Sequence, residues 1–237
     1  MVVALPNGFI LHDIVGERQW IMNGGRNRCP RHNYFLLLQK LMMSTHDYDN
    51  QDHLLAHCSS QMIYEDVMLR GLGLEEDYIE KKLKLKSGYD FFTANDYPPL
   101  QNYEKQNIGQ GPHVDPSLLV FIIENVSGGL QVQHHGKWLN VNLKPGSILV
   151  NVADHLEILT NGKYKSVVHR VTVNNEARRV TLPMFMGPSL NTVVSLAQDL
   201  VDETNPPAYR SITYKQYLEF NEFHLIDGKS CLHQIRL

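Results

Sequence analysis

GPHVDPSLLVF, at residues 111–121, places a histidine and an aspartate two positions apart, directly before a run of apolar residues. In an extended strand alternate side chains share a face, so His113 and Asp115 would point the same way. The continuation SLLVFIIE, at residues 117–124, is typical of a buried strand. Two interpretations follow: the polar pair is the solvated entrance to a strand, or it binds a ligand.

Short strands and turns dominate the chain after residue 88. The other candidate strands are GYDFFT (88–93), SILVNV (147–152), KSVVHRVTV (165–173), RRVTLPMF (178–185) and the two arms of LQVQHHGKWLNVN (130–142), a hairpin around His135-Gly136. Closely spaced strands with Gly and Pro turns predict a mainly β fold, a sandwich or jelly roll rather than βαβ units. Flanking α-helices are predicted at 154–162, with Asp154 placed to cap, and at 209–220, with Thr213 as the cap.

The N-terminal part of the chain is less regular. Residues 1–50 fit no single hydrophobic period, whereas residues 54–70 have helical spacing and LEEDYIEKKL (74–83) suggests a short second helix. We therefore expect a partial, divergent N-terminal helical region over residues 1–87. The predicted jelly-roll domain with its C-terminal helix covers residues 88–237.

Composition narrows the class of protein. The 237 residues are 43% apolar and 20% charged, which is typical of a globular chain with a real core. The net charge of −3 is spread over interspersed basic and acidic residues, which argues against nucleic-acid binding. The N-terminus has no signal-peptide or membrane-span pattern, and the three cysteines are scattered. We expect a cytoplasmic monomer that binds a small-molecule substrate and no membrane.

Histidine is the unusual residue, with 12 copies, and this motivates a search for metal ligands. A non-haem ferrous site needs two imidazoles and one carboxylate on one side of the ion. His113 and Asp115 can supply two of these, and His169, in an apolar candidate strand, is the best third. Each residue also has a plain explanation, because His-x-Asp is common and His169 could be a core histidine. We interpret His134, His135 and His155 as structural or exposed.

A second motif lies ten residues beyond His169. Arg179 and Thr181 occupy alternate positions of a candidate strand and therefore share a face. The planar guanidinium matches a carboxylate through two parallel hydrogen bonds, and the threonine hydroxyl can add a third. The pair suits the distal carboxylate of a dicarboxylate co-substrate. Arg178, on the opposite face, is expected to form a surface ion pair.

These residues resemble the signature of the plant 2-oxoglutarate- and Fe(II)-dependent dioxygenases. The flanking segments GGLQVQHHGKWLNV, PGSILVNVADHLEILTNGKYKSVVHRVTVNN and NPPAYRSITYKQYLEF are similar to that family, over about residues 54–237. The resemblance implies a double-stranded β-helix (jelly roll) core. It also implies that His113, Asp115 and His169 hold Fe(II), and that Arg179 and Thr181 bind the C5 carboxylate of 2-oxoglutarate.

The family motif Asn-x-Tyr-Pro-Pro is matched by Asn95, Tyr97 and the two prolines that follow, so Asn95 and Tyr97 are expected near the co-substrate. Val114, Leu100 and Thr181 depart from the residues usual at their positions, but none of these changes removes a ligand. Residues 1–50 do not resemble the family's N-terminal region, which helps to wall the substrate pocket. Val120, Ile122 and Phe185 are candidates for an apolar pocket wall, and a role as plain core residues explains them at least as well.

The implied activity is hydroxylation or desaturation of a small plant metabolite, an indoleamine such as melatonin or a phenolic or flavonoid. O2 and 2-oxoglutarate would be consumed, succinate and CO2 formed, and ascorbate would act as activator. The alternative is a truncated, non-catalytic paralogue that keeps metal and 2-oxoglutarate binding.

Overall fold

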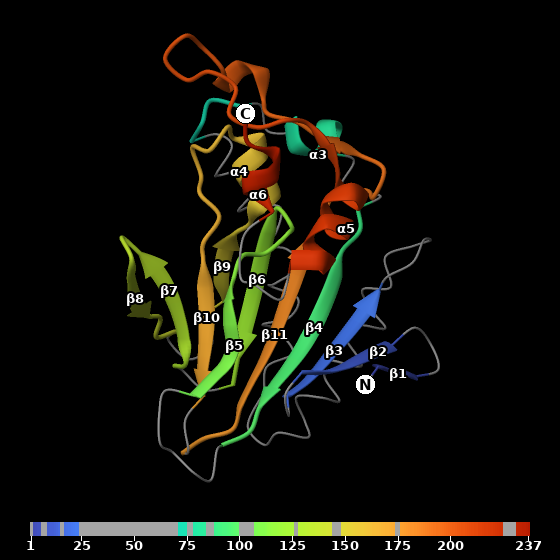
Figure 1. Cartoon of the computed structure of the whole chain (residues 1–237), viewed down its shortest axis with the longest axis vertical. Coiled ribbons are helices and arrows are strands. Elements are labelled where there is room, and N and C mark those ends of the chain that lie inside the picture. Colours follow the sequence, from blue (N-terminus) through green and yellow to red (C-terminus); the bar gives the residue numbers. More distant parts are fainter. Residues whose placement is uncertain are drawn as a thin grey trace. The chain divides into compact units, whose positions relative to one another are not determined.

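Strands from distant parts of the sequence pair to form two larger β-sheets. The computed structural model describes residues 2–5, 9–14, 17–23, 71–74, 78–83, 88–99, 107–125, 128–143, 148–173, 176–224 and 231–237. The strands of the first sheet, in spatial order, are β1 (Val2–Leu5), β2 (Phe9–Ile14), β3 (Glu17–Asn23), β4 (Phe91–Tyr97), β11 (Arg179–Met186), β6 (Leu119–Glu124) and β9 (Leu149–Val152). Those of the second are β5 (Asn107–His113), β10 (His169–Val173), β7 (Leu130–His134) and β8 (Lys137–Asn140). Antiparallel strands dominate the described residues (Figure 1), which confirms the predicted mainly β, jelly-roll fold class.

The central strand β6 explains why the sequence carries an uninterrupted apolar run there. It pairs with β11 on one side and β9 on the other, and all six of its residues are buried. Val120 and Ile122 face one way and pack with Ala153 and Phe185, while Phe121 is fully buried on the other face. A strand covered on both faces needs apolar residues at successive positions rather than alternating ones.

The predicted hairpin at 130–142 is confirmed as β7 and β8. His135 and Gly136 at its turn have φ values of 47° and 73°. Positive φ at both central residues is the backbone of a type I′ turn, whose twist matches that of the flanking strands. His134 and His135 are exposed here, as expected.

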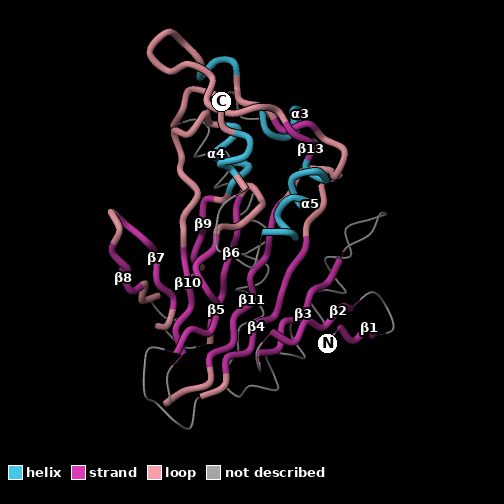
Figure 2. Tube along the Cα trace, in the orientation of Figure 1, coloured by secondary structure: helices cyan, strands magenta, loops and turns pink. Residues whose placement is uncertain are grey.

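Helices α4 (Asp154–Leu159) and α5 (Tyr214–His224) lie near one end of the long strands (Figures 1 and 2). The Thr213 cap of α5 is confirmed, because Gln216 N–H donates to Thr213 Oγ1 at 3.2 Å and Thr213 N–H donates to Gln216 Oε1 at 3.3 Å. The predicted Asp154 cap of α4 is wrong: Ala153 occupies the N-cap position and no side chain caps this helix. The Asp154 carboxylate instead accepts a hydrogen bond from the Tyr217 hydroxyl at 2.5 Å.

The N-terminal region differs from the expected helical one. Residues 2–23 hold three strands, and β3 pairs with β4 in the register Arg18↔Asp96 to Asn23↔Phe91. One compact unit comprises Met1–Asn23 with Leu83–Leu237, and the other comprises Gly24–Lys82. The strand β4, with which β3 pairs, lies about 70 positions downstream in the sequence. Local hydrophobic periodicity therefore cannot predict this pairing.

The short helix expected over residues 74–83 is present as α3 (Tyr78–Leu83). The helix predicted over 54–70 lies outside the described residues. Among the helices that the structure describes, none has the length and apolar character needed to cross a membrane.

Candidate functional site

His113, Asp115 and His169 come together, with one donor atom from each lying within 4.8 Å of the others. The Asp115 carboxylate approaches both rings: its Oδ1 is 3.9 Å from His113 Nε2 and its Oδ2 is 3.7 Å from His169 Nε2. The two imidazole centroids are 4.1 Å apart. Two imidazole nitrogens and one carboxylate on one side of a common point form the donor set of non-haem Fe(II) centres.

Both histidines come from the four-stranded sheet, and Asp115 comes from the connection between β5 and β6. His169 is the first residue of β10 and lies directly opposite His113, the last residue of β5. The expectation that His113 and Asp115 share a strand is wrong, because β5 ends at His113 and Asp115 belongs to the connection that leads to β6. The two side chains converge because the chain crosses here from one sheet to the other.

Backbone carbonyls fix which nitrogen of each ring faces the carboxylate. His113 Nδ1 lies 2.8 Å from the Gly111 carbonyl, and His169 Nδ1 lies 2.9 Å from the Val167 carbonyl. Carbonyl oxygens accept only, so each Nδ1 carries a proton and Nε2 is the ring nitrogen that faces the carboxylate. Burial, reinforced by the neighbouring His169, lowers the pKa of His113 to about 4. The ring is therefore neutral near pH 7, the form that binds a metal ion.

The connection that carries Asp115 is held by the first turn of α4. Asp154 N–H donates to the Asp115 carbonyl and His155 N–H donates to the Ser117 carbonyl, both at 2.9 Å. Burial raises the pKa of the Asp154 carboxyl to about 7. His155 is fully buried between the ring edges of Tyr214 and Tyr217, so the expectation of a structural role fits, but exposure does not.

The residues predicted to bind a co-substrate lie on one face of the seven-stranded sheet. Arg179 on β11 lies opposite Tyr97 on β4, and Thr181 lies opposite Asn95 in the next row. All four are buried. The Arg179 guanidinium lies 5.4 Å from the centroid of the Tyr97 ring. Arg178 points to the other face and pairs with Asp96, confirming the predicted surface ion pair.

Sequence reasoning missed Glu124, which extends the second row across β6. It lies opposite Thr181, and its Oε2 accepts hydrogen bonds from Arg179 Nη2 at 2.7 Å and Arg179 Nε at 3.2 Å. Its side chain is 5% exposed and that of Arg179 is 7% exposed, so this is a buried ion pair. The available signal was a single acidic residue at the end of the apolar run 117–124.

Several buried polar atoms on this same face have no hydrogen-bond partner among the described residues. They are Thr93 Oγ1, Asn95 Oδ1, Asn151 Nδ2 and Arg179 Nη1. Thr93 alternates with Asn95 along β4, and Asn151 lies opposite Val120, on the Glu124 face of β6. Buried polar groups are nearly always hydrogen-bonded in proteins, so their concentration here fits a polar ligand between the sheets. Val120, Ile122 and Phe185 lie on the same face as a buried apolar cluster.

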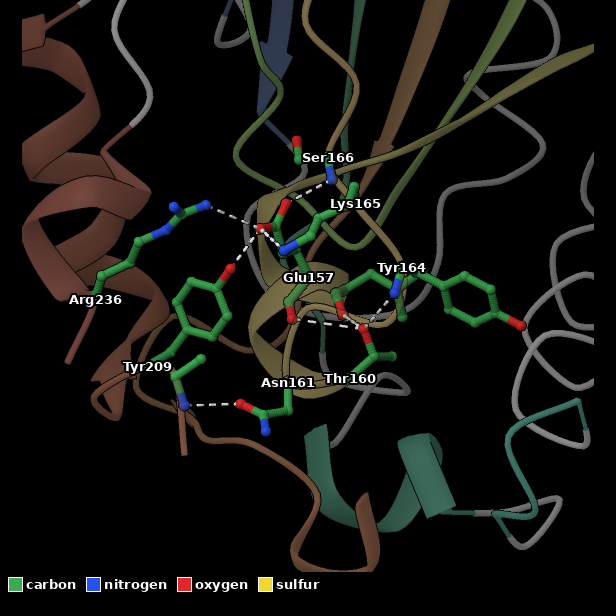
Figure 3. A network of polar contacts seen from close by, with 10 residues as sticks. Glu157, Thr160, Asn161, Tyr164, Lys165, Ser166, Tyr209 and Arg236 are labelled. Atoms are coloured by element: carbon green, nitrogen blue, oxygen red, sulfur yellow. Dashed lines mark hydrogen bonds and ion pairs between the residues drawn. The ribbon is translucent and has the colours of Figure 1, made fainter. Parts of the chain in front are cut away.

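A separate polar network fastens the C-terminal segment to α4 (Figure 3). The buried Glu157 carboxylate accepts hydrogen bonds from Ser166 N–H at 2.7 Å, from Lys165 Nζ at 3.2 Å and from the Tyr209 hydroxyl. Arg236 Nη2 approaches it at 3.5 Å. Burial and the adjacent Glu157 raise the pKa of Tyr209 to about 12. The Glu157 side chain thus connects α4 with residues 165–166, Tyr209 and Arg236.

Comparison with known sequences agrees with this geometry. A sequence profile of the 2OG-Fe(II) oxygenase superfamily matches residues 88–188, a range that includes all seven predicted site residues. The chain carries a 2OG-Fe(II) oxygenase superfamily domain. It is 33% identical over 184 residues to 2-oxoglutarate-dependent dioxygenase 19 of Oryza sativa subsp. japonica, covering 77% of this chain and 55% of that protein. It is 35% identical over 160 residues to the flavonol synthase/flavanone 3-hydroxylase of Matthiola incana, covering 68% and 53%. The chain thus spans about half the length of these relatives.

Solved structures show the same architecture. JOX2, crystallised in complex with 2OG, Fe and JA, superposes with a TM-score of 0.75 at 26% identity, covering 93% of this chain and 64% of that one. The rice dioxygenase for auxin oxidation superposes with a TM-score of 0.69 at 20% identity, covering 98% and 77%. The likeness to the rice dioxygenase concerns the fold alone.

Proposed function

We propose that the protein is a 2-oxoglutarate- and Fe(II)-dependent dioxygenase that hydroxylates or desaturates a small plant metabolite and forms succinate and CO2. The observation that carries this proposal is the convergence of two imidazoles and one carboxylate in a chain whose seven-stranded sheet also holds a buried face with Arg179 and Thr181. The family assignment of residues 88–188 supports it.

In this proposal each residue has a defined task. His113, Asp115 and His169 hold Fe(II) through Nε2, a carboxylate oxygen and Nε2. When bound, the ion with 2-oxoglutarate supplies O2 activation, and ascorbate keeps it reduced. Arg179 and Thr181 bind the distal carboxylate.

The surrounding face would orient the co-substrate and keep water away. Asn95 and Tyr97 lie in the two rows that hold Thr181 and Arg179, and would contact the co-substrate from β4. The apolar cluster of Val120, Ile122 and Phe185, on the same face of the sheet, would exclude water from the site.

The substrate class is proposed from the relatives. Their names include a flavonol synthase, so flavonoids and phenolics form the first panel to test, and indole compounds such as melatonin, implied by the family resemblance, form the second. We also propose that the protein acts as a cytoplasmic monomer, with residues 88–237 as the catalytic domain.

Succinate release tests the proposal. Purified protein with Fe(II), ascorbate and 2-oxoglutarate should form succinate, faster with the correct metabolite, and His169→Ala should abolish it. His134→Ala is the matched control, because this histidine is exposed on the β7–β8 hairpin, and it should retain wild-type turnover. Equal turnover by the His169→Ala variant would refute the proposed site. Binding of 2-oxoglutarate without turnover on any compound would favour the non-catalytic alternative.

A further inference from the structure

Arg179, the proposed partner of the co-substrate carboxylate, already has a carboxylate partner in the protein. Glu124 Oε2 accepts from both Nε and Nη2, which occupies one whole edge of the guanidinium. Arg179 Nη1 has no hydrogen-bond partner among the described residues. A co-substrate carboxylate must therefore bind at the Nη1 end beside Glu124, or displace Glu124 from the other edge.

The strand register keeps Glu124 close to Thr181. It lies directly opposite Thr181, and Asn95 lies opposite Thr181 on the other side, so Asn95, Thr181 and Glu124 form one row across β4, β11 and β6. Directly opposite side chains in antiparallel strands are within about 5.5 Å at Cβ. A carboxylate that reaches the Thr181 hydroxyl would consequently lie beside Glu124.

The charges of Glu124 and Arg179 determine how strongly a co-substrate carboxylate binds here. Glu124 and Arg179 together are neutral, and both are buried. A second carboxylate at the same guanidinium would lie close to the Glu124 carboxylate in a region of low effective dielectric, where like charges repel strongly. With an amide in place of Glu124, the same guanidinium would meet one carboxylate alone.

We propose that Glu124 is an affinity-determining residue that competes with 2-oxoglutarate for Arg179 and so weakens co-substrate binding. This inference rests on the proposed function, because it requires that Arg179 receives the distal carboxylate. It implies a dioxygenase that responds to the concentration of 2-oxoglutarate rather than one saturated with it. Glu124 acts here through Arg179 and performs no chemistry.

Binding measured without turnover tests the inference. The full chain is loaded with Mn(II) in place of iron, and the dissociation constants of 2-oxoglutarate and 2-oxobutyrate are measured anaerobically by calorimetry. Glu124→Gln keeps an oxygen acceptor for Arg179 and removes the charge, so it should bind 2-oxoglutarate about tenfold to a hundredfold more tightly. Its affinity for 2-oxobutyrate, which lacks the distal carboxylate, should change by less than about twofold.

Asp96→Asn is the matched control, because it removes a carboxylate from the neighbouring Arg178 on the opposite face of the same sheet. It should leave both dissociation constants within about twofold of wild type. If Glu124→Gln folds poorly, as judged by urea unfolding, Glu124→Met serves as the second variant with the same expected direction.

The outcomes separate the two proposals. Unchanged or weaker binding of 2-oxoglutarate by the Glu124 variants overturns the competition and leaves the proposed function in place. Equal tightening for 2-oxobutyrate also overturns it, because the distal carboxylate would not be involved. If neither wild type nor variants bind either compound, the proposed function itself fails.

Discussion

Arg178 and Arg179 are adjacent in the sequence and lie in opposite environments. The Arg178 side chain is 62% exposed and pairs with Asp96 at the surface, whereas that of Arg179 is buried against Glu124. An exposed ion pair contributes little to stability, but removing one partner of a buried pair leaves an uncompensated charge.

Replacing each arginine by alanine should therefore have unequal effects. Arg179→Ala should lower the free energy of unfolding by about 3–5 kcal/mol, and Arg178→Ala by at most about 1 kcal/mol. Urea denaturation of the metal-free protein measures both. Similar losses would contradict the buried pair between Arg179 and Glu124.

His155 should make the fold sensitive to acid. Burial lowers its pKa from 6.5 to about 3 in the folded state, so the unfolded chain binds a proton first as the pH falls. Its contribution to stability is fully present above pH 6.5 and is lost as the pH falls from there toward 3. At about pH 5 the loss is up to about 2 kcal/mol.

His155→Phe keeps an aromatic ring between Tyr214 and Tyr217 and removes the titrating group. Its loss of unfolding free energy between about pH 7.5 and about pH 5 should be smaller than that of wild type by up to about 2 kcal/mol. Parallel pH profiles for the two proteins would show that His155 does not titrate in this way.

At the scale of the element, α5 depends on its first turn. Thr213 and Gln216 exchange hydrogen bonds that satisfy two backbone N–H groups. Thr213→Ala should destabilise the protein by about 1 kcal/mol, measured by the urea midpoint. Thr213→Ser keeps the hydroxyl and should lose less than half of that; equal losses would point to the methyl group instead of the cap.

The elements also show what sequence reasoning can reach. Local signals were sufficient for the β7–β8 hairpin, the two-sided burial of β6 and the α5 cap, because turn chemistry and periodicity act between near neighbours. The strands at 2–23 were missed, since their pairing with β4 is decided by contacts far along the chain. Its place at the start of a helix predicts Asp154 as a cap, but its carboxylate accepts a hydrogen bond from the buried Tyr217 hydroxyl, a contact that local sequence does not reveal.

The site was predictable to the same extent. Motif spacing selects the candidate ligand residues and the arginine–threonine pair. Pairing of β5 with β10 brings His113 beside His169, and pairing of β11 with β4 aligns Arg179 and Thr181 with Tyr97 and Asn95. Sequence reasoning misses Glu124 because one acidic residue at the end of an apolar run does not indicate a functional site by its neighbours alone. Its importance follows from the β6–β11 register, which aligns it with Thr181.

At the scale of the whole molecule, Glu157 joins segments that are far apart in sequence. It contacts Lys165, Tyr209 and Arg236, and the C-terminal segment also pairs through Arg210 N–H to the Ile235 carbonyl at 2.7 Å. Without the negative charge, the C-terminal residues would lose one of the groups that hold them near α4; Asn161, which hydrogen-bonds to Pro206 and Ala208, is another.

Glu157→Gln should lower the free energy of unfolding by about 1–3 kcal/mol and speed amide exchange at Arg210 and Leu237. Hydrogen exchange with urea denaturation measures both. Glu219→Gln is the control, because Glu219 pairs with Lys215 at the surface, and it should change stability by less than about 0.5 kcal/mol. Unchanged exchange in the Glu157 variant would mean that other contacts hold the C-terminal segment.

The crossing between His113 and Asp115 has a consequence for the whole protein. Only Val114 separates these two residues in the sequence. His113 ends a strand of the four-stranded sheet, whereas Asp115 lies on the connection that leads into the seven-stranded sheet. The distance of Asp115 from the two histidines therefore depends on how closely the two layers pack, whereas His113 and His169 are held together by the pairing of β5 with β10. A core substitution that swells the sandwich by a few tenths of an ångström would stretch the donor triangle while leaving the strands intact. Metal affinity would then serve as a gauge of interior packing, falling in damaged variants before any spectroscopic sign of unfolding.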